Sequence, residues 1–188
     1  MKVFVFFTFD VSLKVWSDKG LLERELCLYE NYADCGHEIF LLTYGFTDDL
    51  LYYNYPNITV LPVYSRIPCS NFLFLRFLAS FLIPLLFSSY LKSSDVIKTN
   101  QTWGAHVAII SKFLFNKPLL ARSGYDFYQF FKEKSNNLFF RSLVFVYSSF
   151  TFKFADKVHV STQREKDSIL SLYNHATKSV SVVPNWID

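Results

Sequence analysis

The sequence predicts an α/β fold with a mostly parallel, Rossmann-like sheet covered by helices on both faces. Short runs rich in Val, Ile and Phe alternate with longer helical patterns from end to end. Several of these runs are apolar on consecutive residues, as strands buried on both faces must be. The chain has 188 residues, of which 51% are hydrophobic and 19% charged. One ordinary domain fits this length, and disorder is excluded as the main state.

Seven short runs are expected to be strands. They cover residues 2–7, 38–43, 58–63, 95–99, 118–122, 157–161 and 180–183. The first strand begins with a single lysine, and the apolar run that it belongs to ends before Asp10. This run is too short for a signal peptide. In such a fold ligands bind outside the carboxyl ends of the strands. The loops expected there cover residues 8–19, 44–57, 100–104, 123–126 and 162.

Three helices are clear between these strands. Residues 20–34 place Leu22, Leu26 and Tyr29 on one face, and Gly36 is suited to the left-handed position that ends the helix. Residues 103–116 form the next helix. The last helix begins at residues 162–165, where the sequence T-Q-R-E is a capping box.

Residues 72–91 form an apolar stretch about as long as a membrane span. Arg76 and Pro84 interrupt it, and polar or proline residues recur every four positions from Arg76 to Lys92. Three interpretations stay open: a helix lying on the bilayer interface, a plain packed helix, and a transmembrane span. Residues 138–154 have a similar character, and two such segments favour peripheral membrane association.

The charge is unevenly distributed along the chain. Residues 1–65 hold 4 basic and 9 acidic side chains, whereas residues 66–157 hold 12 basic and 4 acidic ones. A basic middle rich in Phe and Leu suits an anionic membrane surface or a phosphate-bearing ligand. An ordinary solvated basic face is the alternative. Nucleic acid fits less well, because no nucleic-acid-binding motif is present.

Several kinds of site are disfavoured. Five glycines argue against a Gly-rich phosphate loop, and the three cysteines lack the spacing of a zinc site. Unpaired cysteines of this kind indicate a reducing compartment, so we expect a cytoplasmic location. His37 and His159 are expected to be structural, whereas His106 follows a strand-end loop and has a smaller chance of facing the crevice. No metal and no cofactor is predicted.

The loops after the fourth and fifth strands carry the best candidates for ligand binding. Arg122 offers a planar fork suited to phosphate or carboxylate, and Gly124 allows close backbone approach. A tight turn with an ion pair is the alternative. Amides and aromatic rings suited to carbohydrate are also present. The candidates in these loops are Asn100, Gln101, Trp103, Arg122, Ser123, Gly124, Tyr125 and Asp126.

Four motifs of the sequence resemble motifs of one known family, and they occur in the same order as in that family. LLERELCLYENYADCGHEIFLLTYG is similar to the first helix and second strand of family-4 glycosyltransferases, with their G-H-E-V turn. DVIKTNQ resembles the fourth strand and its loop. FADKVHVST is similar to the family's A-D-x-V-x-x-x-S/T strand. VVPNWID is similar to V-I-P-N-G-V-D, which leads into the second domain.

This resemblance implies one half of the GT-B fold, in which two Rossmann-like domains transfer a sugar from a nucleotide donor with retention and usually without a metal. The domain expected over residues 1–188 is the acceptor-side, N-terminal domain, with the nucleotide-sugar domain absent. The resemblance places Lys19 and Gly20 in the loop that approaches the donor phosphates. Thr162 and Asn185 complete the predicted cleft.

The predicted function is the N-terminal part of a retaining glycosyltransferase. It would act on a glycan or lipid-linked acceptor at the inner face of the cytoplasmic membrane. We expect it to be inactive alone, because half of the cleft is missing. The partners are a nucleotide-sugar, the carbohydrate or glycolipid acceptor and a membrane surface, with no nucleic acid. The alternative is a non-catalytic membrane-associated module that recruits a partner glycosyltransferase subunit. An unrelated nucleotide binder is disfavoured, because no G-x-G-x-x-G follows the first strand.

Overall fold

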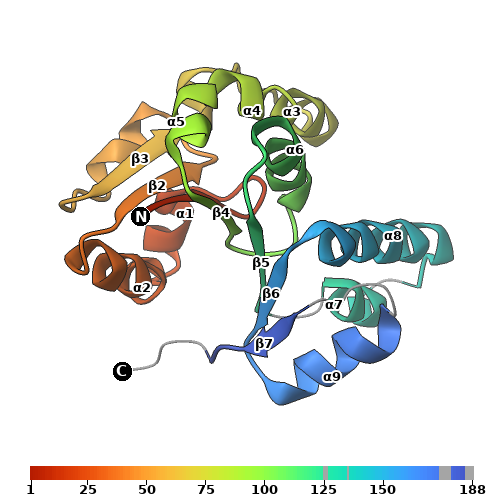
Figure 1. The fold of residues 1–188 in the computed structure, drawn as a ribbon. Helices are drawn as coiled ribbons and strands as arrows, with labels where there is room; N and C mark the ends of the chain where they lie inside the picture. Colours follow the sequence, from red (N-terminus) through yellow and green to blue (C-terminus); the bar gives the residue numbers. More distant parts are fainter. Residues whose placement is uncertain (125–126, 135, 174–178, 185–188) are drawn as a thin grey trace.

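The computed structural model describes residues 1–124, 127–134, 136–173 and 179–184. Seven strands form one parallel sheet in the order β3-β2-β1-β4-β5-β6-β7 (Figure 1). The strands are β1 Lys2–Phe6, β2 Glu38–Thr43, β3 Ile58–Pro62, β4 Val96–Thr99, β5 Leu119–Ser123, β6 Lys157–Val160 and β7 Val180–Val182. The predicted Rossmann-like fold is therefore confirmed, and each predicted strand boundary lies within one residue of the observed one.

Alternate residues of β1 pack into two different cores, which explains its unbroken apolar run. Val3 and Val5 face α1 (Leu13–Asp18) and α2 (Leu22–Asp34), where Trp16 and Tyr29 are buried. Phe4 and Phe6 belong to the core on the opposite face. Both faces of the strand are thus buried, as expected for the central strand of a parallel sheet.

The second core lies beneath most of the remaining helices. On this face lie α4 (Ile83–Leu86), α5 (Ser88–Ser93), α6 (Ala105–Phe115), α8 (Leu138–Phe154) and α9 (Gln163–Leu172). Their buried residues include Ile83, Phe87, Phe152 and Ile169. Helix α3 (Leu73–Ser80) lies beside α4 and α6, and α7 (Phe127–Lys134) packs against α8 (Figure 1).

One half of the first face has no helix over it. Helix α2 packs against β2 and β3 and reaches Lys98 of β4 through Tyr29. Beyond it, none of the described helices packs on this face over β5, β6 and β7 (Figure 1). Val96, Leu120 and His159 instead line a cavity of about 550 Å³.

The expected single helix over residues 72–91 is wrong, because the segment forms three short helices, α3, α4 and α5. Pro84 occupies the first turn of α4. Its ring would clash with the carbonyl of the residue four positions earlier, so α3 ends at Ser80. No helix in the described part of the chain is long and apolar enough to cross a membrane. Residues 138–154 do form one helix, α8.

Four elements were not expected from the sequence. Helix α1 and the 3-10 helix η1 (Thr47–Leu51) lie in segments predicted to be loops, and α7 follows β5. A second 3-10 turn, η2 (Val63–Ser65), follows β3. Ser12 caps α1, since its hydroxyl accepts a hydrogen bond from the Val15 amide at 3.2 Å.

Gly104 allows the loops after β1 and β4 to pack together. Its φ is +103°, and a Cβ atom there would lie 2.7 Å from the backbone nitrogen of Phe9. Gly36, which follows α2, has a φ of +79° but open space around it. A comparison of the two glycines therefore separates the cost of the left-handed backbone from the cost of close contact with neighbouring atoms.

We predict that Gly104→Ala lowers the free energy of unfolding by about 3 kcal/mol, whereas Gly36→Ala lowers it by about 1 kcal/mol. Both alanines adopt a left-handed conformation, but only the one at position 104 also meets backbone atoms. Urea denaturation of the two variants measures the difference. Equal losses would contradict the close packing of the two loops.

Candidate functional site

The strand order reverses between β1 and β4, and the candidate site lies at the carboxyl ends of these central strands. The Asn100 amide donates to the Phe6 carbonyl at 2.8 Å, and the Phe9 amide donates to the Trp103 carbonyl at 3.0 Å. These bonds hold the two loops side by side. The ends of β5 and β6 continue the same edge.

A polar cluster joins α2 to β4 and β5 just below this edge. Arg122 Nη1 donates to Asn100 Oδ1 at 3.4 Å and lies 3.5 Å from Glu25 Oε2. Tyr29 Oη also donates to Asn100 Oδ1, at 3.4 Å. The structure therefore brings together two of the predicted residues, Asn100 and Arg122, and adds Glu25 and Tyr29 to them.

Lys98 is the most buried charged member of this cluster, with 7% of its surface exposed. Its ammonium donates to Tyr29 Oη at 2.8 Å, and no carboxylate of the described residues lies within ion-pair distance. The pKa of Lys98 is lowered to about 7, mainly by burial and in part by the positive charge of Arg122, while Glu25 opposes the shift. Lys98 is thus poised between its charged and neutral forms at neutral pH.

The cluster opens into a second cavity of about 340 Å³. Three of its lining side chains are basic (Arg24, Lys98 and Arg122), and Glu25 is the carboxylate among them. The lining residues are Arg24, Glu25, Leu28, Tyr32, Lys98, Arg122, His159, Val183 and Pro184. Positive charge in a partly enclosed space favours an anionic ligand such as a phosphate.

A separate polar network connects the ends of β5 and β6 to α9. Ser123 Oγ donates to Glu165 Oε1 at 2.9 Å, and the Ser161 amide donates to Glu165 Oε2 at 3.0 Å. Thr162 caps α9 by accepting from the Glu165 amide at 3.1 Å, which confirms the N-cap of the predicted capping box. Glu165 is buried and fixes both loops.

Gln101 and Gly124 meet above this network. The Gly124 amide donates to Gln101 Oε1 at 2.9 Å, so the loops after β4 and β5 are in direct contact. Gly124 and Thr162 also share a polar cavity of about 490 Å³ with Gln129, Glu133 and Arg164. Hydrogen-bonding side chains around a space of this size suit the hydroxyl groups of a carbohydrate.

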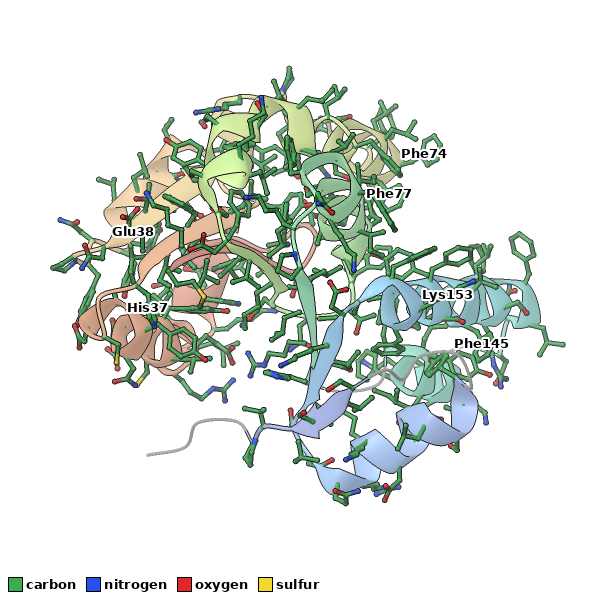
Figure 2. The ribbon with its side chains drawn as sticks, viewed as in Figure 1. His37, Glu38, Phe74, Phe77, Phe145 and Lys153 are labelled. Atoms are coloured by element: carbon green, nitrogen blue, oxygen red, sulfur yellow. The ribbon has the colours of Figure 1, made fainter. Side chains whose placement is uncertain are left out.

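Trp103 occupies a more interior position than a sugar-stacking residue requires. Its ring stacks on Phe127 with a centroid distance of 5.3 Å and on Phe77 at 6.1 Å. Phe77 points from α3 inward, where it stacks on Trp103, whereas Phe74 points outward (Figure 2). Trp103 therefore ties α3 to α7 and leaves mainly its edge for a ligand.

Lys19 and Gly20 lie in an exposed turn between α1 and α2. Gly20 has a φ of +63°, and its amide donates to the Ser17 carbonyl at 3.0 Å. Helix α2 begins two residues later and carries Glu25, which lies 3.5 Å from Arg122. Tyr125, Asp126 and Asn185, also predicted for the site, lie outside the described residues.

His106 has a structural role at the start of α6. One ring nitrogen, Nε2, lies 2.8 Å from Ser80 Oγ, and Nδ1 lies 3.1 Å from Tyr147 Oη. Burial lowers the pKa of His106 to about 4, so the ring is neutral at pH 7. The imidazole links α3, α6 and α8.

Asp10 is a residue at this edge that the sequence reasoning did not select. It follows β1 with a φ of +65°, and its Oδ1 accepts from Tyr64 Oη at 2.9 Å and from Arg76 Nη1 at 2.9 Å. A non-glycine residue in this conformation is uncommon. The turn from residue 8 to residue 11 had no motif that distinguished it from other loops.

No protein-family model matches the chain, and no curated protein matches it in sequence. Solved structures do match. HepE from Anabaena in complex with UDP-glucose is 17% identical with a TM-score of 0.63, over 100% of this chain and 44% of HepE. The apo form of the lipopolysaccharide outer core galactosyltransferase WaaB is 16% identical with a TM-score of 0.60, over 100% of this chain and 46% of WaaB.

A plant structure gives the same likeness. UGT89C1 from Arabidopsis thaliana, complexed with UDP-L-rhamnose, is 12% identical with a TM-score of 0.61, over 99% of this chain and 53% of UGT89C1. These matches show the fold, which is that of one half of a GT-B glycosyltransferase. The chain spans about half the length of the structures it matches.

The burial of Lys98 makes a pH-dependent prediction. In the unfolded chain this lysine keeps its proton up to about pH 10.5, whereas in the folded chain it loses the proton near pH 7. The unfolded state therefore binds more protons between these values, and stability rises with pH. Relative to Lys98→Met, the wild-type free energy of unfolding should rise by at most about 1.4 kcal/mol per pH unit from about pH 7 to about pH 10.

Denaturation at several pH values measures this difference, with Lys157→Met as the control on the exposed surface of β6. The control should show no such slope. A difference between wild type and Lys98→Met that stays constant with pH would contradict an uncompensated charge at Lys98.

Proposed function

We propose that the chain is the acceptor-side, N-terminal part of a retaining glycosyltransferase that takes its sugar from a nucleotide-sugar. The acceptor in this proposal is a glycan or a lipid-linked sugar. The nucleotide-sugar binds mainly to a second Rossmann-like domain, which completes the cleft. The chain works on the inner face of the cytoplasmic membrane, where a lipid-linked acceptor is held.

The observation that carries the proposal is the arrangement of the carboxyl edge around the strand-order reversal. Asn100, Gln101, Arg122 and Gly124 converge there from two neighbouring strands. Amide groups suit neutral sugar hydroxyls, and a guanidinium beside them suits the negative charge that develops on a departing nucleoside diphosphate. In the reaction the bond between the sugar and the phosphate breaks and a new bond forms from the sugar to an acceptor oxygen. The nucleoside diphosphate leaves and takes up the proton that the acceptor hydroxyl loses.

The relatives in fold support the same chemistry. HepE and UGT89C1 form complexes with UDP-sugars, and WaaB is a galactosyltransferase. The four ordered motifs of the sequence resemble family-4 glycosyltransferases, and this resemblance supports retention of configuration and an N-terminal position. Half of a two-domain cleft lacks part of the donor site, so we expect the chain to be inactive alone.

A second candidate function rests on the half of the sheet that no described helix covers. The apolar cavity there, lined by Val96 and Leu120, suits a partner protein. In this alternative the chain is a non-catalytic module that recruits a glycosyltransferase subunit. Leu120→Arg would then prevent the association, while changes at Arg122 would have no effect on any bound ligand.

The proposed function is tested by donor binding and by transfer. The isolated chain should bind UDP-glucose weakly, and Arg122→Gln should weaken this binding by about tenfold, because a charge-assisted contact to the diphosphate is lost. Arg141→Gln removes a similar charge from α8, away from the site, and should leave the affinity unchanged. Nuclear magnetic resonance titration measures all three proteins.

Transfer is measured with radiolabelled UDP-glucose, UDP-galactose and UDP-N-acetylglucosamine in the presence of a lipid extract. We expect no labelled product from the chain alone. Sugar transfer by the chain alone at the rate of an ordinary enzyme would contradict its dependence on a second domain. Equal UDP-glucose affinity of wild type and Arg122→Gln would contradict the role of Arg122.

A further inference from the structure

The helices on the second face of the sheet expose many large apolar side chains. We define the apolar surface as the exposed Phe and Leu residues of α3 and α4, with their neighbours on α6 and α8. Its members are Phe72, Leu73, Phe74, Leu75, Leu78, Phe81, Leu82, Leu85, Leu86, Phe113, Leu114, Leu138, Phe139, Phe140, Leu143, Val146 and Phe150. Single exposed apolar residues are common on soluble proteins, but a set of this size marks an interaction site.

The apolar surface belongs to helices that are joined to one another. Helix α4 packs on α6, and α6 packs on α8. His106 connects Ser80 of α3 with Tyr147 of α8, and the rings of Phe113 and Phe154 lie 5.4 Å apart. Figure 2 shows Phe74 pointing outward from α3, on the same side of the sheet as α8. The exposed side chains therefore form part of one layer.

The fold does not need these outward residues for its core. Ile83, Phe87 and Phe152 of the same helices point inward and are buried. On α8, Phe139, Leu143, Val146 and Phe150 repeat at helical spacing on the exposed side. Helices that are apolar on both their inner and their outer sides are expected where a second apolar environment covers them.

The charges beside the apolar surface are mostly basic. Exposed Lys92 lies in the last turn of α5 and exposed Lys153 in that of α8, while Arg141 lies in the first turn of α8. None of these three has an ion-pair partner among the described residues. Two acidic residues of this region, Asp95 and Asp156, are bound to the Lys2 amide and to Lys112.

We propose that the apolar surface binds a lipid bilayer that contains anionic lipids. Apolar side chains flanked by lysine and arginine are what interfacial binding requires, since the former enter the acyl boundary and the latter face the headgroups. Because no described helix can span a membrane, the chain lies on the bilayer. Arg76 of α3 holds Asp10 at the carboxyl edge, so the bilayer lies next to the candidate site.

This inference deepens the proposed function and rests on it only for the acceptor that the bilayer delivers, a lipid-linked sugar. Membrane binding itself requires neither donor nor acceptor. It is therefore measured without either, and its failure is distinguishable from a failure of glycosyl transfer.

The first test is co-sedimentation with vesicles of phosphatidylcholine alone and of phosphatidylcholine mixed with phosphatidylglycerol. Wild type should bind the mixed vesicles more strongly, and added salt should weaken the binding. The combined variant Phe74→Ser, Leu85→Ser and Phe139→Ser should lower the partition coefficient by at least about tenfold. These three side chains are 69%, 62% and 67% exposed, so the fold should persist, as circular dichroism would verify.

The matched control is Phe46→Ser, Leu50→Ser and Leu51→Ser, which removes three exposed apolar side chains around η1. It should bind vesicles as wild type does. A second pair of variants isolates the contribution of charge to vesicle binding. Lys92→Glu with Lys153→Glu should abolish the preference for anionic vesicles, whereas Lys157→Glu with Lys166→Glu, which changes the net charge equally, should retain most of it.

Three results would overturn the proposal. Wild type that binds neither kind of vesicle would exclude the bilayer as the occupant. Equal binding by the apolar-surface variant and the η1 control would show that another surface is responsible. Association of wild type into dimers that the apolar-surface variant abolishes, without vesicle binding, would assign the surface to a second copy of the chain.

Discussion

The close approach of the loops after β1 and β4 is the contact on which the rest of the carboxyl edge depends. Gly104 leaves room for the Phe9 amide to reach the Trp103 carbonyl at 3.0 Å. Helix α6 begins directly afterwards, and Tyr147 Oη accepts from the Gly104 amide at 3.0 Å, which ties α8 to the same point. A larger residue at position 104 would displace this loop, and with it the start of α6 and the attachment of α8.

Two different environments meet at this edge. Toward β6 and α9, Glu165 is buried but fully engaged by Ser123 and Ser161, so its charge stabilises the loops. Toward α2, Lys98 is buried against Tyr29 with no carboxylate of the described residues beside it. A buried charge that lacks a partner destabilises a fold. The lowered pKa lets Lys98 lose its charge near neutral pH, and the uncovered half of the sheet is open at this point.

Much of this fold follows from local sequence, because central strands such as β1 and β2 are buried on both faces and therefore contain consecutive apolar residues. The cap formed by Thr162 was equally readable. Long-range contacts could not be predicted from the local sequence. In the sequence Lys98 looks like any other strand lysine, because its burial depends on Tyr29, which lies 69 residues earlier. Pro84 explains why residues 72–91 do not form one helix. Where the resulting short helices lie depends on which of their faces pack against the rest of the fold. Asn100 and Arg122 were predicted separately, and only the pairing of β4 with β5 brings them to 3.4 Å.

Carbohydrate binding at the carboxyl edge around Asn100, Gln101, Arg122 and Gly124 is the core of the proposed function. The most direct measurement is a titration of the ¹⁵N-labelled chain with a panel of disaccharides, including lactose, cellobiose and chitobiose, followed by amide chemical shifts. We expect at least one sugar to shift the amides of these four residues, while those of η1 and of the uncovered half of the sheet stay unchanged. Shifts confined to the uncovered half, or none with any sugar, would rule out carbohydrate binding at this edge.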